Sequence, residues 1–508
     1  MQKVKGCWVV SLVLFTLTEG KTQLTEPRET IAIGNTKQLF IDDKLIQSRK
    51  SVDFVMNRPY STGEVLIETD LPHEAGGEVY LYSSVLKDNE GKVKIWYDFL
   101  RQKSKTDPYD HDRHVGYAES ADGIHFTKPD VGLHALNGSK KNNVVLPGII
   151  GGSAVWLDPQ APPAHRYKTQ AKVYPSGKLH MHSSPDGINW KFFSEINPRG
   201  PFDTQTIVFW DENISQHVLY GRHFVDRKEG DELVFRRRGV RRAILENYQD
   251  VKDTGVVLWP DFIDQGTYSD KVRQNPVDYY GATVFPYSET KGVYIMLTQA
   301  FWHWVTDTEF QGTGEPGTRD IRLEVSRDGS VFSKAGARKA FITPGPLGRF
   351  DSRQIWAMPN PIVMGDEIWI YYCGVNWDRA GRIDPMAPGG KKKSAITRAV
   401  MRLDGFVSLD APYDAVGEVV TKPVTFEGGK LEINTDTGGG GSIRVEILEE
   451  DGTPIPGFTL QESDWIVGNS VRYPVTWKGK ADVKELEGKP VRLRFVMRDA
   501  RLYAFQFK

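Results

Sequence analysis

Short apolar runs separated by clusters of Gly, Pro, Asn and Asp dominate the chain, and almost no segment has the apolar period of a helix. The clearest runs are residues 93–97, 206–210, 293–297 and 367–372. Runs of this length, either alternating or continuously apolar, are typical of β-strands that are buried on one or both faces. The pattern therefore predicts an all-β protein.

A repeated turn sequence divides these strands into similar units. Residues 120–126 (SADGIHF) recur as residues 184–190 (SPDGINW) and again as residues 326–332 (SRDGSVF). Asp-Gly favours a tight turn, and the aromatic residue that ends each copy can pack against the sheet, so we interpret the three aspartates as structural. The gap between the second and third copies is about double the first gap. We therefore expect a degenerate copy within residues 241–259.

Together, the strands and turns predict a repeat architecture over residues 38–410. The expected units cover residues 78–135, 150–200, 201–260, 275–345 and 350–410. Units of this kind in one chain suggest a five-bladed β-propeller, in which ring closure protects the sheet edges. We expect the strand at residues 38–46 to complete the ring by pairing with the last unit.

The last part of the chain has a different pattern of strands and turns, which predicts a second domain over residues 414–508. Short strands alternate with Gly-rich turns, including residues 438–441. Residues 491–496 and 502–507 are interpreted as paired strands of a C-terminal β-sandwich. Because no Pro-rich or Ser-rich linker separates the two regions, we expect the domains to pack tightly.

The first 20 residues have the pattern of a signal peptide. Lys3 and Lys5 precede an apolar run at residues 7–17, and a small-x-small sequence follows at residues 18–20. The run is shorter than the roughly 20 residues that a membrane-spanning helix needs; a buried N-terminal strand is the alternative. We expect a secreted or periplasmic protein. Removal of Cys7 would leave only Cys373, so the fold must depend on its core rather than on an intramolecular disulfide.

Charge and composition exclude several classes of function. The 65 Lys and Arg residues nearly balance 66 Asp and Glu residues, and no long basic block indicates a nucleic-acid partner. The sequence contains no phosphate-binding Gly-rich loop, zinc motif or hydrolase elbow, so we predict neither a metal nor a cofactor. The 13 Trp and 20 Tyr residues suit the apolar faces of sugars, although packing within sheets is the alternative for each ring.

Acidic residues at or near the start of the predicted inner strands are the catalytic candidates. They are Glu78, Asp203, Asp278 and Asp351. Carboxylates that converge on a propeller axis shift each other's pKa, so one can protonate a leaving oxygen while another acts as nucleophile or base. The alternative for each acid is a hairpin cap or an arginine partner.

Four other residues are candidates for substrate binding. Arg222 follows Asp203 by one strand and could hold a substrate oxygen or a carboxylate. Trp302 and His303 follow the fourth predicted inner strand, where an indole ring could stack on a sugar, and Tyr279 is adjacent to Asp278.

The sequence resembles the five-bladed propeller glycoside hydrolases, namely the invertase and levanase group (family 32) and the arabinanase and xylosidase group (family 43). The resemblance covers roughly residues 38–410 and depends on residues 116–126 (GYAESADGIHF), 202–205 (FDTQ) and 323–329 (LEVSRDG). By placement, Asp203 resembles the inner-strand acid of these enzymes. The chain is more similar to uncharacterised secreted bacterial proteins that share LFIDD at residues 39–43. The nucleophile segment of family 32 (WMNDPNG) is absent, so the resemblance implies the fold and broad class only.

These observations favour a secreted glycoside hydrolase that cleaves a polysaccharide or an oligosaccharide. A non-catalytic sugar-binding propeller is the first alternative. A glycoside phosphorylase is the second, since Arg222 with Arg241 or Arg242 could form a phosphate site. A propeller that binds other proteins is the last alternative, and acids on the inner strands disfavour it.

Overall fold

The computed structural model describes the protein at residues 30–102, 111–148, 150–172, 178–197, 204–229, 232–261, 264, 268–269, 272–273, 277–304 and 316–508. These residues confirm the predicted all-β class, because their helical segments are short 3-10 turns. The turns are η1 (Asp43–Leu45), η2 (Pro72–Glu74), η3 (Pro163–His165), η4 (Ala335–Arg338), η5 (Pro388–Gly390) and η6 (Lys484–Leu486). None of the helices in these ranges is long and apolar enough to cross a membrane. The predicted signal peptide lies outside the described residues.

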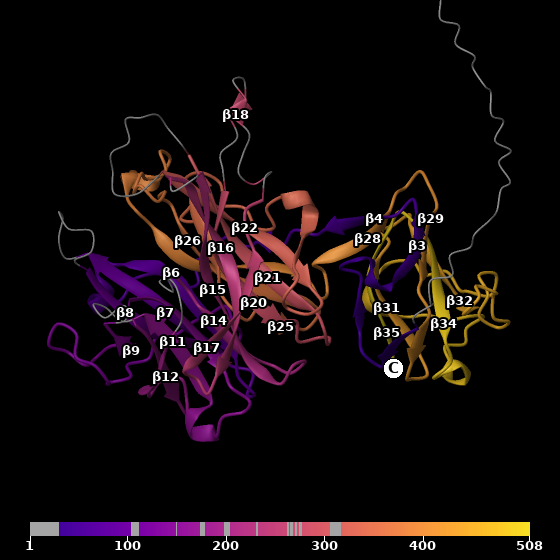
Figure 1. Ribbon diagram of the computed structural model, residues 1–508, viewed down its shortest axis with the longest axis horizontal. Helices are drawn as coiled ribbons and strands as arrows, with labels where there is room; N and C mark the ends of the chain where they lie inside the picture. The colour runs from indigo at the N-terminus through magenta and orange to yellow at the C-terminus, as the bar shows by residue number, and fades with distance from the viewer. Residues whose placement is uncertain are drawn as a thin grey trace, which may run out of the picture.

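Three antiparallel four-stranded sheets form the first half of the larger part of the molecule (Figure 1). The first sheet contains β6 (Glu78–Lys87), β7 (Val93–Gln102), β8 (His111–Ser120) and β9 (Val144–Pro147). The second contains β10 (Ile150–Leu157), β11 (Tyr167–Lys172), β12 (Leu179–Ser184) and β13 (Lys191–Ile196). The third contains β14 (Ile207–Asp211), β15 (Gln216–Glu229), β16 (Glu232–Glu246) and β17 (Asp250–Leu258).

The fourth and fifth sheets are joined into one hydrogen-bonded sheet by a single parallel bridge between Arg319 and Gln354. The fourth contains β20 (Val277–Pro286), β21 (Tyr294–His303), β22 (Gly317–Ser326) and β23 (Ser333–Lys334). The fifth contains β24 (Gln354–Ala357), β25 (Ile362–Met364), β26 (Glu367–Val375), β27 (Ser394–Arg402) and β5 (Tyr60–Ser61). A separate two-stranded ribbon consists of β18 (Tyr268–Ser269) and β19 (Val272–Arg273).

Each sheet packs against the next through buried apolar side chains, and the fifth packs against the first. The five shared cores contain, in order, Trp96 with Val155, Trp156 with Leu219, Val218 with Met296, Ile295 with Ile370, and Tyr371 with Val85. The first two strands of the fourth sheet are buried almost throughout, as a continuously apolar pattern predicts. The five sheets therefore contact one another in cyclic order.

The repeated Ser-x-Asp-Gly sequences form the turns after β8, β12 and β22. In the second copy, Asp186 Oδ1 accepts hydrogen bonds from the backbone N–H groups of Ile188 and Asn189, both at 2.8 Å. The glycine carbonyl of each copy accepts a hydrogen bond from a ring of the preceding sheet. These pairs are Tyr371 with Gly123 (2.8 Å), Trp96 with Gly187 (2.6 Å) and Tyr220 with Gly329 (2.6 Å). The turn aspartates Asp122, Asp186 and Asp328 are thus structural, while the expected degenerate copy is a plain hairpin between β16 and β17.

Two further six-stranded sheets form a β-sandwich beside the five sheets (Figure 1). One contains β1 (Ile31–Gly34), β30 (Val424–Phe426), β34 (Val491–Arg498), β29 (Gly417–Thr421), β3 (Ile46–Lys50) and β32 (Ser442–Glu449). The other contains β33 (Asn469–Pro474), β31 (Leu431–Asp436), β35 (Ala500–Phe507), β28 (Val407–Ala411), β4 (Asp53–Met56) and β2 (Gln38–Leu39).

The segment at residues 38–46 differs from its prediction. Instead of closing the last of the five sheets, β2 pairs with β35 of the sandwich, and β3 pairs with β29. The strand that pairs with β27 of the fifth sheet is β5, about 20 residues later in the chain. An alternating apolar pattern shows that a strand has one buried face, but it does not identify the neighbouring strand. The sandwich therefore contains more than the predicted residues 414–508. Strands β1 to β4, near the start of the described chain, and β28 also belong to it.

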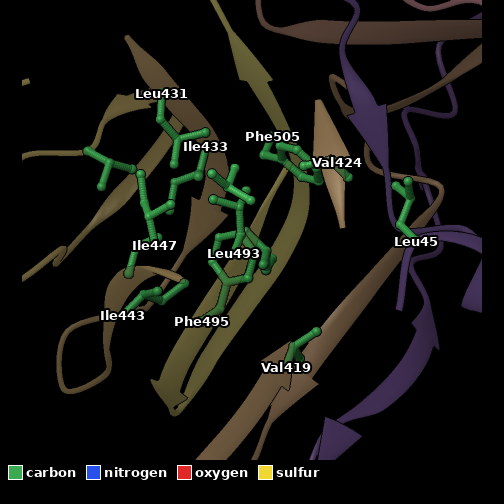
Figure 2. Packing of buried hydrophobic residues seen from close by; sticks show 14 of the residues in the cluster. Leu45, Val419, Val424, Leu431, Ile433, Ile443, Ile447, Leu493, Phe495 and Phe505 are labelled. Atoms are coloured by element: carbon green, nitrogen blue, oxygen red, sulfur yellow. The ribbon is translucent and has the colours of Figure 1, made fainter. Parts of the chain in front are cut away.

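The core of the sandwich lies between its two sheets (Figure 2). Phe495 on β34 and Phe505 on β35 pack on each other with ring centroids 6.2 Å apart. We predicted that these two segments pair as neighbouring strands, and this prediction is wrong. The chain crosses from one sheet to the other at Asp499, which has a φ of 48°. Both strands keep an apolar inner face, so the sequence pattern is the same for either arrangement.

The sandwich contacts the fourth and fifth sheets directly. Leu39, Ile41 and Ala504 share a buried core with residues of these sheets, including Phe285. Arg327 of the turn after β22 donates to both carboxylate oxygens of Asp42, at 3.0 and 2.9 Å. The interface therefore combines an apolar core with a bidentate ion pair.

Candidate functional site

Aromatic side chains from the first, fourth and fifth sheets meet near the N-terminal ends of their first strands. Tyr82 on β6 and Trp356 on β24 lie edge to face, with ring centroids 4.8 Å apart. Tyr280 on β20 lies 5.9 Å from Trp356 and 5.8 Å from Phe301 on β21. The sheets thus bring together an aromatic cluster whose members are Tyr80, Tyr82, Tyr280, Phe301 and Trp356.

Four arginines surround the Tyr280 ring and form what we call the arginine cluster. The guanidinium carbons of Arg319, Arg238 and Arg222 lie 4.1, 4.6 and 6.0 Å from the centroid of this ring. Arg379, on the exposed loop after β26, donates a hydrogen bond from Nη1 to the Tyr280 hydroxyl at 2.6 Å. Strand register explains the position of Arg319, because it is directly opposite Phe301 in the β21–β22 ladder.

The charges of this cluster change the ionisation of Tyr280. Burial by itself raises the pKa of the phenol, but the positive charges of Arg319, Arg379, Arg238 and Arg222 outweigh it and hold the pKa below its usual value of 10.0. Burial in turn lowers the pKa of Arg319. The potential at this position is therefore strongly positive.

Asp278 is a fully buried carboxylate beside the cluster. Its Oδ2 forms a short ion pair with Arg238 Nη1 and lies 3.1 Å from His303 Nε2, while Oδ1 accepts from the Arg238 backbone N–H at 3.1 Å. Burial raises the pKa of Asp278, but the hydrogen bond with His303 and the charge of Arg238 outweigh it and lower the pKa. Asp278 is thus held in its ionised form.

Glu78 is the contrasting acid at the start of β6, two residues before Tyr80. Its side chain is 28% exposed, and Oε1 lies 3.7 Å from Lys392 Nζ. Burial raises the pKa of Glu78, and Lys392 offsets only part of this effect. Lys392 also lies over the Trp377 ring, at 4.9 Å from its centroid. Glu78 is therefore easier to protonate than an ordinary glutamate.

A second buried ion pair supports the first-sheet side of the site. Arg113 on β8 donates to Asp98 Oδ2 on β7 at 2.7 Å, and both side chains are almost fully buried. The Arg113 guanidinium also lies 4.4 Å from the centroid of Tyr80. Since a carboxylate partner neutralises Arg113, its main contribution is to hold the ring in place.

Three of the residues predicted from the sequence meet at this site, namely Asp278, His303 and Arg222. His303 also packs on Phe301, with ring centroids 4.7 Å apart. Glu78 begins the strand that carries Tyr80 and Tyr82. Asp203 lies outside the described residues.

The structure places the other predicted residues away from the Tyr280 ring. Tyr279 alternates with Tyr280 along β20, and its hydroxyl donates to Asp264 Oδ2 at 2.7 Å, in the direction of the third sheet. The half-buried Trp302 donates from its indole to Asp320 Oδ2 at 2.9 Å.

Asp351 is fully buried, but its contacts with Tyr372 and Arg349 lie elsewhere in the fifth sheet. It accepts a hydrogen bond from the Tyr372 hydroxyl at 2.9 Å and lies 3.2 Å from Arg349 Nε. The backbone of the loop also contacts it, since the Gly345 N–H donates to the Asp351 carbonyl at 3.1 Å. These contacts hold the loop before β24.

Of the arginine cluster, only Arg222 was predicted from the sequence, because the candidates were chosen mainly as acids on inner strands. Arg241 pairs with Asp253, and Arg242 lies 3.9 Å from Asp211, so neither joins Arg222 at Tyr280. A usable signal existed at Arg319, which takes a position on β22 where strand alternation with Ile321 calls for an apolar residue. Arg379 lies on a loop and carries no such signal.

Among the described residues, no group of three or more His, Cys, Asp and Glu side chains could hold a metal ion. Asp112 on β8 is paired with Arg101 at 2.9 Å.

Comparison with known proteins gives remote structural likenesses only. No protein-family profile matches the sequence, and no curated protein matches it. A β-1,2-mannobiose phosphorylase from Listeria innocua shows 14% identity and a TM-score of 0.46, over 68% of this chain and 97% of its own. A glycosyl hydrolase from Bacteroides ovatus shows 12% identity and a TM-score of 0.43, over 72% and 97%. An N-acetylgalactosamine deacetylase from F. plautii shows 13% identity and a TM-score of 0.42, over 70% of this chain and 96% of its own. At these values none of the likenesses assigns a function to this chain.

Proposed function

We propose that the five sheets form a five-bladed β-propeller with the arginine cluster at one end of its axis. The cyclic order of the five shared cores supports this arrangement, as do the contacts between first strands. β10 contacts both β6 and β14, β14 contacts β20, and β24 contacts β6. First strands that meet around one axis would bring Glu78 and Asp278 to the same end, because both lie at the start of their strands.

We propose further that the protein is a carbohydrate-active enzyme that cleaves glycosidic bonds of an oligosaccharide or a polysaccharide. The observation that carries this proposal is the ionised, buried Asp278 beside a cluster of aromatic rings. Aromatic faces stack on the apolar faces of sugars, and a carboxylate that is held ionised beside them is suited to act as nucleophile or base.

The two acids differ in the way that glycoside hydrolysis requires. Asp278, whose pKa is lowered, would act as nucleophile or base, and Glu78, whose pKa is raised, would protonate the leaving oxygen. If Asp278 is the nucleophile, water then breaks its bond to the anomeric carbon, leaving a hydroxyl on the sugar and returning a proton to Glu78; if Asp278 is the base, it takes the proton of the attacking water as Glu78 gives its own to the leaving oxygen, and exchange with solvent resets both acids. Asp203 remains the proposed second inner carboxylate, and Arg222 and His303 would orient the substrate or Asp278. Arg349 and Tyr372 give Asp351 a positioning role instead.

Trp302 and Tyr279 would stabilise the strands of the site rather than stack on the sugar. The indole of Trp302 donates to Asp320 and the hydroxyl of Tyr279 donates to Asp264. These bonds help to hold β21 and β20, the strands that carry His303 and Asp278.

A glycoside phosphorylase is the second candidate, and the arginine cluster is the observation that favours it. In such an enzyme inorganic phosphate, rather than water, attacks the anomeric carbon, and guanidinium groups are suited to bind it. The two reactions differ in their product, because phosphorolysis releases a sugar 1-phosphate and hydrolysis releases a reducing sugar.

The test is release of reducing sugar by the mature chain from a panel of plant and algal glycans, with and without phosphate. We expect activity in the wild type and at least a hundredfold loss in Asp278→Asn, with smaller losses in Glu78→Gln. Asp203→Asn is measured beside them. Asp414→Asn, at an exposed loop position, is the matched control and should keep full activity. Phosphate-dependent formation of sugar 1-phosphate would select the phosphorylase. Full activity of the Asp278 variant on every glycan would refute the assignment.

We also propose that the chain is exported after removal of residues 1–20. N-terminal sequencing of the protein recovered outside the cytoplasm should begin at Lys21; an intact Met1 on the exported protein would contradict the proposal.

A further inference from the structure

Arg319 is a buried cation without a counter-ion. The residue is 4% exposed, and Nε is buried without a hydrogen-bond partner. Within the described part of the chain, no carboxylate and no hydrogen-bond acceptor contacts its guanidinium, which is held only by the rings of Tyr280, Phe301 and Trp356. A charge removed from water in this way is costly unless something pairs with it.

The neighbouring charge of Arg379 adds to this cost. The side chain of Arg379 has one hydrogen bond, to the Tyr280 hydroxyl, and no carboxylate contact among the residues that the structure describes. The charge of Arg379 lowers the pKa of Arg319, and the two guanidinium groups lie over the same phenol ring, at 5.4 and 4.1 Å from its centroid. The buried carboxylate of the site, Asp278, is engaged by Arg238 and His303. An anion supplied from outside would relieve this arrangement.

We propose that Arg319 and Arg379 form an oxyanion subsite that binds the carboxylate or sulfate group of an acidic sugar. This inference rests on the proposed function, and it names the class of substrate. Planar guanidinium groups bind carboxylate and sulfate through two parallel hydrogen bonds, a geometry that a neutral sugar hydroxyl does not match.

The position of the subsite suits a substituent on the bound sugar. Arg379 lies on an exposed loop, so the oxyanion can be approached from solvent, and Arg319 closes the inner side above Trp356. The aromatic cluster would then contact the sugar ring while the two arginines hold its charged group. Arg238, which is paired with Asp278, links this subsite to the proposed catalytic carboxylate.

Binding, measured by calorimetry without any need for turnover, tests the subsite independently of the reaction. The probes are trimers of galacturonate, mannuronate and guluronate, each beside its carboxyl-reduced counterpart, together with sulfated and desulfated galactan oligosaccharides and inorganic phosphate. The variants are Arg319→Met, which keeps an unbranched apolar stem over Tyr280, and Arg379→Gln. Arg444→Met is the matched control, because Arg444 stacks on Trp465 in the sandwich, far along the chain from the site.

We expect at least one acidic oligosaccharide to bind tenfold or more tightly than its neutral counterpart. Arg319→Met should remove this preference, Arg379→Gln should reduce it, and Arg444→Met should leave it unchanged. The midpoint of thermal unfolding of ligand-free Arg319→Met should equal or exceed that of the wild type, since an unpaired buried charge is removed. The same acidic ligand should stabilise the wild type and not the variant.

The possible failures are distinguishable. Equal binding of all acidic and neutral pairs, or a preference that Arg319→Met retains, would overturn the inference even if neutral glycans are cleaved. Arginine-dependent binding of phosphate alone would also overturn it and assign the cluster to the phosphorylase reaction. Arginine-dependent binding of an acidic oligosaccharide without cleavage of any glycan would uphold the subsite while refuting the enzyme.

Discussion

Buried ionisable side chains in this protein differ in whether they have a partner, and a buried charge without one indicates a candidate ligand site. Asp158 accepts hydrogen bonds from His217 and Tyr248, at 3.0 and 2.7 Å, and links the second and third sheets. Arg319 lacks any such partner among the described residues. A fully satisfied group contributes to the fold, whereas an unsatisfied one reduces stability and calls for a ligand.

Glu324 on β22 is a buried acid whose ionisation should make stability depend on pH. Burial raises the pKa of Glu324 from its usual value of 4.5 to about 7, although the Thr298 hydroxyl donates to it at 2.5 Å. Between these pH values the folded state binds more protons than the unfolded state, so stability should fall as pH rises from about 4.5 to about 7. Glu324→Gln removes the ionisation.

The free energy of unfolding in urea, measured at pH 4, 6 and 8, checks this prediction. Relative to the wild type, Glu324→Gln should gain roughly 2–3 kcal/mol more at pH 8 than at pH 4. The surface variant Glu485→Gln should follow the wild type. Parallel pH curves for the wild type and Glu324→Gln would contradict the prediction.

Cys373 on β26 should be unreactive in the folded protein. The side chain is fully buried, and burial raises the pKa of the thiol well above its usual value, so the reactive thiolate is scarce. We expect no labelling of the mature chain by a thiol reagent at pH 8 and complete labelling in denaturant. Rapid labelling of one thiol without denaturant would show that β26 opens, or that Cys7 is retained.

At the scale of elements, the Ser-x-Asp-Gly turns connect neighbouring sheets as well as neighbouring strands. Each turn is closed internally by its Ser and Asp side chains, and the ring of a residue from the preceding sheet caps its glycine carbonyl. At Gly187 the φ is +81°, and a Cβ atom would lie 2.5 Å from Trp96 Cζ2. The turn therefore needs glycine both for its backbone conformation and for the close approach of the indole.

Asp186→Ala should destabilise the protein without affecting the proposed site. The substitution removes the acceptor of the Ile188 and Asn189 backbone N–H groups and of the Ser184 hydroxyl. A loss of about 1–3 kcal/mol in the free energy of unfolding is expected, since the turn is partly exposed to water. Thermal or urea unfolding of the wild type and of Asp186→Ala measures the loss, with Asp414→Ala as the control. A large loss of activity in folded Asp186→Ala would instead give this aspartate a functional role.

At the scale of the whole molecule, the sandwich is built from both ends of the described chain. Strands β1 to β4 pair with β28 to β35, and the indigo strands β3 and β4 lie among the orange and yellow strands in Figure 1. The sandwich also shares a core with the fourth and fifth sheets through Leu39 and Ile41. We therefore expect the sandwich and the five sheets to fold cooperatively.

A chain that ends at residue 413 should not fold stably. It would leave the inner faces of β1 to β4 uncovered, including Phe40, which packs on Phe495 and Phe505 in the intact protein. We expect aggregation, or a midpoint of thermal unfolding lowered by more than about 10 °C, because a large apolar core is lost. The mature full-length chain is the control. A soluble fragment with an unchanged midpoint would show that the five sheets fold independently.

Local chemistry explains which features could be predicted from the sequence alone. Strands at residues 93–97, 206–210, 293–297 and 367–372 were recognisable, because a buried strand needs apolar side chains over a few consecutive positions. The Asp-Gly turns were recognisable for the same reason, since their hydrogen bonds join residues within a few positions of one another. Asp278 was identified as a charge in an otherwise apolar strand.

Only the tertiary structure decided which strands are neighbours and which charges meet. Residues 38–46 have one apolar face that fits either part of the molecule, and the sandwich takes them. The arginine cluster joins Arg222, Arg238, Arg319 and Arg379, which come from three different sheets or their loops. Arg222 and Arg319 stand out in their strands, but neither they nor Arg238 and Arg379 indicate from the sequence that the four meet. Their convergence on one ring depends on contacts between Tyr280 and residues about 40 to 100 positions away in the chain, and no local pattern encodes such contacts.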